Sequence, residues 1–423
     1  MTTMLRPYAA DSAPAARVAE AAPAGRVNRA ARWALYLYIL SIPFELPHRS
    51  FPVEVPTITG ALFLAATLSC PGACFRRIPA AAGWFLLHVW ILVALVVAFA
   101  VGDMGPALQQ ISLFLQVILI LITLYNVLAD PRVLRGALLT LVVATAARAA
   151  VQVSGLAATR AVEWGGGERV TAFGQNANLS AMILAAGLVA VLGLRAPKDP
   201  RLPRLGLLVW PVAAVLGFAL IQTGSRGGML CALAGLVAFW FAPDQRLGRR
   251  VLNGVLGLLA AAALAWGAFQ NTAMRNRLTN AEGGNLAGRE IIYPGAIEMI
   301  AERPVFGWGP VANQFELSRR LHLDTRKYPS RDVHNLLLEL LSTSGVIGTI
   351  PFLIGLGLCL RGAWRARRGP VGLIPLAMLV AVLTGTLSGT WIISKILWLA
   401  LPVALAAGAH WAEPAQPQPG RIA

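Results

Sequence analysis

Hydrophobic and polar positions fall into long blocks along this chain rather than alternating from residue to residue. Apolar runs of about 20 residues recur between Trp33 and His410, which is the length that a helix needs to cross a ~30 Å hydrocarbon core. A membrane β-barrel would instead show segments of about 10 residues with alternating hydrophobicity. The pattern therefore predicts an all-α polytopic membrane protein.

The apolar runs predict about 12 transmembrane helices, separated by polar segments. Nine fall within residues 32–269 and three within residues 334–410. Residues 270–333 form one large polar loop, and residues 1–31 and 411–423 are tails. We expect the first tail, which is rich in alanine, arginine and proline, to be disordered. The predicted helices span approximately residues 33–46, 55–70, 80–101, 108–128, 136–156, 179–194, 205–222, 229–241, 251–269, 335–360, 371–387 and 396–410.

The distribution of arginine predicts the side of the membrane that each segment faces. Every even-numbered helix up to the tenth exits into a segment with arginine, whereas the turns after the third, seventh and eleventh helices hold few basic residues. Because cytoplasmic loops collect Lys and Arg, we expect both termini to be cytoplasmic. Residues 157–178, 223–228 and 270–333 then face the periplasm. The last segment is itself rich in arginine, but loops longer than ~60 residues are largely exempt from the charge rule.

Composition agrees with a membrane protein and excludes an ordinary soluble one. Hydrophobic residues make up 57% of the chain and charged residues 13%, against about 45–50% and about 25% in soluble domains. The net charge of +17 would suggest nucleic acid in a soluble protein, but basic cytoplasmic loops explain most of it here. The four cysteines do not form the paired clusters of a zinc site or a disulfide framework. We therefore expect neither a nucleic-acid partner nor a metal.

The large polar loop contains predicted structure of its own. Residues 289–301 combine helix-forming residues with spaced apolar positions, and Pro294 falls early, where a helix tolerates it. We expect an amphipathic helix that lies on the bilayer surface or caps the bundle. Residues 306–310, Phe-Gly-Trp-Gly-Pro, predict a turn with aromatic anchors.

Two arginines in the outer segments are candidates for binding phosphate, because a guanidinium fork matches phosphate in bidentate geometry. Arg226 lies in Thr-Gly-Ser-Arg-Gly-Gly (223–228), where the glycines allow close backbone approach. Arg289 starts the amphipathic helix, and a cation there opposes the helix dipole unless an anion is shared. The alternatives are a snorkelling side chain for Arg226 and a solvated or ion-paired one for Arg289.

Four further polar residues lie near the same outer boundary. Arg169 precedes the sixth apolar run, and Asn176 and Asn178 stand at its start. The asparagines either cap that helix or bind ligand. Arg148 falls in the outer half of the fifth run, so it needs a partner or a wet cavity. We include all four in the candidate site.

His334 stands where the loop re-enters the bilayer, beside Asp332 and Asn335. Histidine acts as a general base near neutral pH, and the alternative is a hydrogen-bonded structural residue. Several arginines with one histidine on the same side indicate a lipid-linked phosphate or pyrophosphate substrate, handled without metal or cofactor. The arginines would stabilise the leaving group, and the histidine would deprotonate an attacking hydroxyl.

The ordered set of these motifs resembles the O-antigen ligase and polymerase superfamily. It consists of residues 223–228; of Gly-Arg-Glu (288–290) followed by the helix and by PVFGWGPVANQFE (304–316); and of VHNLLLELLSTSGVIG (333–348). The segment RVTAFGQNAN (169–178) is similar to the family's polar turn, although Ala177 replaces the common proline. The resemblance covers roughly residues 169–348, while the first five runs match only in hydropathy.

The resemblance implies an inverting, metal-independent glycosyltransferase of the bacterial inner membrane, acting in lipopolysaccharide biosynthesis. Its donor would be a glycan on undecaprenyl pyrophosphate, bound by Arg226, Arg289 and Arg169. His334 would activate the acceptor hydroxyl, with Arg148, Asn176, Asn178 and Asp332 in support. In a ligase the acceptor is a sugar of lipid A–core, and we expect this activity because of the single large loop and the number of spans. The partners would be donor, acceptor and membrane lipids.

Other functions fit parts of the same pattern. A polymerase would transfer the glycan to another repeat, and a protein O-oligosaccharyltransferase would transfer it to Ser or Thr. Intramembrane arginine in about 12 spans would also suit a transporter for an organic anion or a lipid-linked sugar. A structural partner of an envelope assembly complex would need no chemistry at all.

Overall fold

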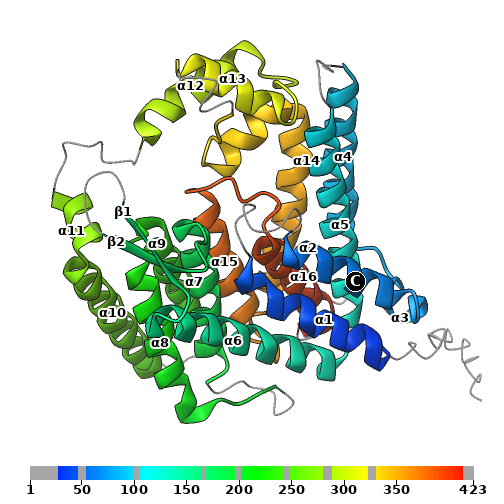
Figure 1. Cartoon of the computed structure of the whole chain (residues 1–423). Helices are drawn as coiled ribbons and strands as arrows, with labels where there is room; N and C mark the ends of the chain where they lie inside the picture. The colour runs from blue at the N-terminus through cyan, green and yellow to red at the C-terminus, as the bar shows by residue number, and fades with distance from the viewer. Residues whose placement is uncertain are drawn as a thin grey trace, which may run out of the picture.

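The computed structural model describes residues 27–45, 54–98, 104–162, 168–195, 202–241, 247–279, 288–322 and 330–412. Within these ranges the chain forms helices and one two-stranded hairpin (Figure 1). In order, the elements are α1 (Arg29–Ser41), η1 (Ile42–Phe44), α2 (Val55–Thr67), α3 (Pro71–Cys74), α4 (Ala80–Ala98), α5 (Gly105–Val127), α6 (Pro131–Ser154), β1 (Ala158–Val162), β2 (Glu168–Ala172), α7 (Ala177–Gly193), η2 (Gly206–Leu208), α8 (Val209–Gln222), α9 (Arg226–Ala238), η3 (Phe239–Phe241), α10 (Leu247–Gln270), α11 (Thr272–Thr279), α12 (Arg289–Glu302), α13 (Ala312–Arg320), α14 (Leu336–Ala366), α15 (Ile374–Thr386) and α16 (Lys395–His410).

Four of the described helices, α4, α5, α6 and α14, are long and apolar enough to cross a membrane. Seven further apolar helices in the described ranges are shorter, with 10–17 residues. The predicted helical fold class is confirmed for the described residues. The total number of spans and the periplasmic side of the large loop stay predictions.

The first helix begins inside the predicted N-terminal tail. Asn28 caps α1, because its side chain accepts a hydrogen bond from the backbone N–H of Ala31 at 2.8 Å. Residues 29–31 are therefore helical rather than part of a disordered tail. The rest of the predicted tail, residues 1–26, lies outside the described part of the chain, as do residues 413–423.

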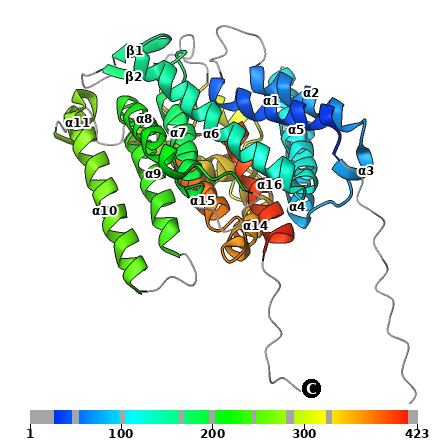
Figure 2. The same cartoon turned by 90° about the horizontal axis from the view of Figure 1, so that it is seen from below.

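Helix α7 lies at the centre of one half of the bundle, and nearly all of its residues are buried. It packs against α6, α8, α9 and α15. Glycines of α9 permit the close approach: a Cβ at Gly228 would lie 2.1 Å from the Cβ of Ala181. Small residues at such contacts are typical of packed membrane helices. Helix α10 flanks α8 and α9 at the edge of this half (Figure 2).

A β-hairpin forms part of the polar segment at residues 157–178. Strands β1 and β2 pair antiparallel, with Arg160 opposite Val170. Strand β2 buries Arg169 and Thr171 and contacts α6, α7 and α8. Val170, between these two buried polar residues, is only half-buried, so the order of apolar and polar residues does not predict which face of the strand is buried.

The large loop folds over the start of α14 with a small core of its own. Helix α12 confirms that residues 289–301 are helical, and one face of the helix is buried. Its buried face meets α13 and the segment before α14. The buried residues of this core are Ile292, Ala296, Met299, Leu317 and Val333.

Helix α14 is interrupted at Gly345, whose φ of 57° and ψ of −165° leave the helical region. The turn that follows α12 fills this break. The backbone N–H groups of residues 308–309 donate to the carbonyls of residues 342–343, each at 2.8 Å. The N–H groups of residues 346–347 donate to the carbonyls of residues 304–305, at 2.9 and 3.2 Å. The loop thus supplies hydrogen bonds that the broken helix cannot make for itself.

Candidate active site

Four helices, α7, α9, α12 and α14, begin in one region of the bundle, around the turn between α15 and α16. A side-chain hydrogen bond joins the first turn of α7 to the residue that caps α9. Three others join the starts of α12 and α14 to residues 387–390 of the turn. Because a helix N-terminus bears partial positive charge, this convergence favours an anion.

Arg169 and Asn178 fix the hairpin to the start of α9. The buried guanidinium of Arg169 donates from Nε to the carbonyl of Thr223 at 2.7 Å and from Nη2 to Asn178 Oδ1 at 3.2 Å. The same Asn178 oxygen accepts a bond from Ser225 Oγ at 2.7 Å. Ser225 in turn caps α9 by accepting from the backbone N–H of Gly228 at 3.0 Å.

Arg226 is the first residue of α9 and is half-buried. It lies within electrostatic range of Arg289 and Arg169, which oppose its positive charge, and of Glu290, which favours it. The predicted donor-binding arginines therefore come together from three elements: β2, α9 and α12.

Arg289 reaches the turn between α15 and α16. Its Nη2 donates to the carbonyl of Ser388 at 2.6 Å, while its buried Nε has no hydrogen-bond partner among the described residues. Gly227 lies against the same turn, because a Cβ on it would stand 2.6 Å from Ser388 Oγ. Ser388 thus lies at the contact between the starts of α9 and α12.

The three guanidinium groups are costly to hold together without an anion. Burial, together with the positive charge of Arg289, lowers the pKa of Arg169 to about 10 from its usual 12.5. A phosphate placed between these side chains would remove the repulsion and supply acceptors for their N–H groups.

His334 precedes α14 in a strained conformation. Its φ is 58°, a value that costs about 1–2 kcal/mol for a residue with a Cβ. Its backbone N–H donates to Thr390 Oγ1 at 3.1 Å, and its carbonyl accepts a long bond from the hydroxyl of Tyr293 at 3.5 Å. Non-glycine residues in this region of φ and ψ cluster at functional sites.

Burial favours the neutral form of the His334 imidazole. Burial lowers its pKa below the usual value of 6.5, and Arg289 and Arg331 lower it as well. The half-buried carboxylate of Asp332 acts in the opposite direction. A neutral imidazole can accept a proton, so the surroundings suit a general base.

Asn335 and Asn176 cap helices. Asn335 accepts from the backbone N–H groups of residues 337 and 338, at 3.0 and 3.2 Å, and so starts α14 immediately after His334. Asn176 does the same for α7, accepting from Asn178 at 2.9 Å. Of the two alternatives left open by the sequence, capping describes the observed bonds of Asn176.

Arg148 lies inside the bundle, fully buried on α6. It donates to Gln175 Oε1 at 2.6 Å, to Gln152 Oε1 at 3.4 Å and to the hydroxyl of Ser180. These bonds join α6 to the start of α7, which also bears Asn178. Arg148 therefore supports the wall of the site. It is linked to the arginine group through α7 and also through Gln152, which donates to the carbonyl of Val170 on β2 at 3.1 Å.

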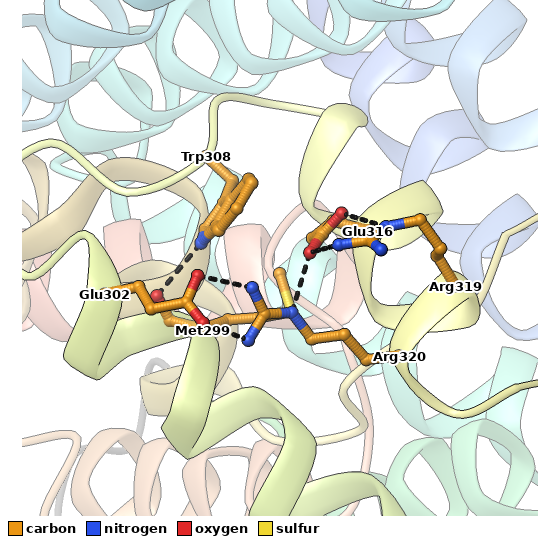
Figure 3. A network of polar contacts seen from close by, with 6 residues as sticks. All are labelled: Met299, Glu302, Trp308, Glu316, Arg319 and Arg320. Carbon is orange, nitrogen blue, oxygen red and sulfur yellow. Dashed lines mark hydrogen bonds and ion pairs between the residues drawn. The ribbon is translucent and has the colours of Figure 1, made fainter.

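Several loop arginines that the sequence left unassigned hold the loop together (Figure 3). Arg320 forms ion pairs with Glu302 and with Glu316 Oε1, the latter at 2.7 Å, and Arg319 bonds the same Glu316. The guanidinium carbon of Arg320 lies 5.2 Å from the centre of the Trp308 ring, and Nε1 of that ring donates to the carbonyl of Met299 at 2.9 Å. These contacts fix α12 and α13 to each other.

The residues that sequence reasoning missed are the uncharged ones of the turn between α15 and α16. Ser388 and Thr390 hold Arg289 and His334 through hydrogen bonds. The only sequence signal was a short polar break, Ser-Gly-Thr, between two apolar runs. Ser225 lies within the motif at residues 223–228, but the sequence did not predict its hydrogen bond with Asn178.

Comparison with known proteins gave one family match. Residues 211–353 match the model of a family described as O-antigen ligase. The matched interval includes Arg226, Arg289 and His334, whereas Arg169 and the hairpin lie before it. No curated protein matched the chain.

Residues 211–353 are therefore similar to the O-antigen ligase and polymerase superfamily, as the sequence motifs indicated. The match indicates a membrane-bound transferase of the ligase or polymerase type. It does not distinguish a ligase from a polymerase.

Proposed function

We propose that the protein is an inverting, metal-independent O-antigen ligase. It would move a glycan from undecaprenyl pyrophosphate to a sugar hydroxyl of lipid A–core. The observation on which this rests is the position of Arg289, within electrostatic range of Arg169, Arg226 and His334. A group that stabilises a leaving pyrophosphate thus stands next to one that can take a proton from an acceptor.

The proposed reaction is a single displacement at the anomeric carbon. His334 takes the proton of the acceptor hydroxyl as its oxygen forms a bond to that carbon. The bond from the carbon to the pyrophosphate oxygen breaks, and undecaprenyl pyrophosphate leaves with the electron pair. Arg169, Arg226 and Arg289 stabilise the charge that develops on this leaving group. Attack from the opposite face inverts the configuration.

The orientation in the membrane is part of the proposal. We place the region where α7, α9, α12 and α14 begin on the periplasmic side of the inner membrane, and both termini in the cytoplasm. The proposed division is 1–31 for the N-terminal tail, apart from the start of α1, 270–333 for the large loop and 411–423 for the C-terminal tail. The distribution of arginine supports this orientation.

The test is reconstitution of the purified chain with a defined undecaprenyl-pyrophosphate glycan. Lipid A–core, a second lipid-linked repeat and a Ser/Thr peptide would be offered separately, and the product identified by mass spectrometry. We expect transfer to lipid A–core alone, with an inverted linkage and full activity in EDTA. His334→Ala should lose about 100-fold or more in rate, in the range of a missing general base.

The matched control is His322→Ala, a histidine of the same loop that also has positive φ but no assigned role. It should leave the rate unchanged. Transfer only to the second repeat would assign a polymerase, and transfer to the peptide a protein glycosyltransferase. Movement of the donor across vesicles without a covalent product would assign a transporter. Each of these results overturns the ligase.

A further inference from the structure

A cavity of about 280 Å³ lies at the end of the bundle remote from the candidate active site. The start of α4 and the ends of α5, α14 and α16 border it. Helix α14 packs against both α4 and α16, and the three helices lie in the same part of the bundle (Figure 2). The active-site end of α14 is about 35 Å away at ~1.5 Å per residue, so the cavity is separate from the residues discussed above.

The walls of this cavity combine apolar and basic groups. Ala80, Leu358 and Leu405 contribute apolar surface, while Arg361 and Arg365 project from α14. The two arginines stand one helical turn apart on one exposed face. Within the described part of the chain, neither forms an ion pair.

Two more arginines lie near the cavity without lining it. Arg76 and Arg77, just before α4, lie within electrostatic range of His410. The His410 ring is bonded at 3.1 Å to the carbonyl of Tyr125, which lines the cavity. Arg76 and Arg77 thus add positive charge close to the cavity, and the N-terminus of α4 adds its partial charge.

We propose that this cavity binds the phosphate of an anionic membrane lipid. Arg361 and Arg365 would share the phosphate oxygens, which removes the repulsion between the two guanidinium groups. The apolar wall of leucine and alanine would contact the first part of an acyl chain. A free phosphate ion has no such apolar part, so the wall favours a lipid. Basic pockets between membrane helices recognise anionic head groups in this way.

The simplest alternative is diffuse attraction, in which exposed arginines draw anionic lipids to the surface without a defined site. The two differ in stoichiometry and in their dependence on the cavity. Ala80→Phe fills the cavity and leaves every arginine in place, so it should abolish a defined site but not diffuse attraction. Arg135→Gln removes an exposed arginine of α6 outside the cavity lining and is the matched control.

The experiment is native mass spectrometry of the delipidated full chain, titrated with phosphatidylglycerol or with phosphatidylcholine of the same acyl chains. We expect one retained phosphatidylglycerol and no retained phosphatidylcholine. Arg361→Gln and Arg365→Gln should each weaken binding about fivefold. Ala80→Phe should abolish it, and Arg135→Gln should leave it unchanged.

Three outcomes would overturn the proposal. They are equal retention of both lipids, binding unaffected by the double arginine variant, and inorganic phosphate that saturates the protein without any retained lipid. Thermal unfolding checks that each variant is folded. If Ala80→Phe fails this check, the double variant compared with Arg135→Gln decides.

Discussion

Arg289 is the residue on which the candidate site depends most, because its guanidinium is only half satisfied. One end is anchored on the Ser388 carbonyl, and the buried Nε lacks a partner among the described residues. A buried unsatisfied donor costs about 1–3 kcal/mol. A phosphate oxygen at this position would remove that cost, which explains why an arginine stands at the start of α12 against the helix dipole.

Replacing Arg289 by lysine should therefore be far from conservative. Lysine keeps the positive charge but loses the planar fork that would span Ser388 and the proposed donor. We expect kcat/KM for the donor to fall by about 10–100-fold, since charged hydrogen bonds contribute about 1.5–3 kcal/mol. Steady-state kinetics with the lipid-linked glycan measures this. Arg319→Lys, an arginine of the same loop paired with Glu316, should change little; an equal loss there would remove the special role of Arg289.

The acid limb of the pH–rate profile should report His334. Activity falls as pH drops through the pKa of the base, because the protonated imidazole cannot accept a proton. Asp332 raises that pKa, so Asp332→Asn should lower it and move the acid limb to lower pH. Arg331→Gln removes a charge that lowers the pKa, so the limb should move to higher pH. Shifts of kcat/KM in the same direction for both variants would contradict His334 as the titrating base.

At the scale of elements, apolar run length predicted most helices, and polar residues marked several of their starts. Arg226, Arg289 and Asn335 stand at or just before the first residue of α9, α12 and α14. The hairpin was not predictable, since its short strands are held by contacts with four helices, α6, α7, α8 and α11, rather than by their own pattern. The break in α14 was equally hidden, because its hydrogen-bond partners lie in the loop around residues 304–309.

That break sets the relation between the large loop and α14, and therefore between Arg289 and His334. A Cβ at Gly345 would lie 2.2 Å from the carbonyl oxygen of Val305, and the backbone there is accessible almost only to glycine. We expect Gly345→Ala to lower the unfolding free energy by at least about 1–3 kcal/mol and to abolish transfer. Thermal unfolding and product formation measure the two effects.

A second glycine of α14 provides the control for this prediction. Nothing lies within 4 Å of a Cβ placed on Gly357. Gly357→Ala should retain activity and gain up to about 1 kcal/mol, because alanine is the better helix former. Equal tolerance of both substitutions would mean that the break has no part in positioning the site.

At the scale of the whole molecule, the sequence predicted the helical class and the group of arginines with His334, but not how they meet. Contacts among β2, α9, α12 and the turn before α16 depend on long-range packing, which hydropathy does not encode. In the folded structure, the helix bundle has a group of basic residues at each of its two ends. One gathers three arginines around helix starts, and the other holds the apolar cavity with Arg361 and Arg365.

The predicted orientation places these two ends on opposite sides of the inner membrane, and it can be tested by labelling. The native cysteines, Cys70, Cys74, Cys231 and Cys359, would first be replaced by serine or alanine. Single cysteines would then be introduced at Arg319, whose side chain is 69% exposed in the loop, and at the exposed Arg135 at the other end. A membrane-impermeant maleimide would be added to spheroplasts and to inverted vesicles.

Arg319→Cys should react in spheroplasts and Arg135→Cys in inverted vesicles, because the positive-inside rule assigns α6 an arginine-rich cytoplasmic start. The reverse result would mean that the protein has the opposite orientation in the membrane, with the arginine site on the side away from a periplasmic donor. Reaction of both cysteines in one preparation would mean that the two positions lie on the same side of the membrane. The chain would then cross the membrane an even number of times between them, whereas the predicted orientation requires an odd number. Either result would contradict the ligase reaction proposed for this chain, since the proposed glycan donor would be presented in the periplasm.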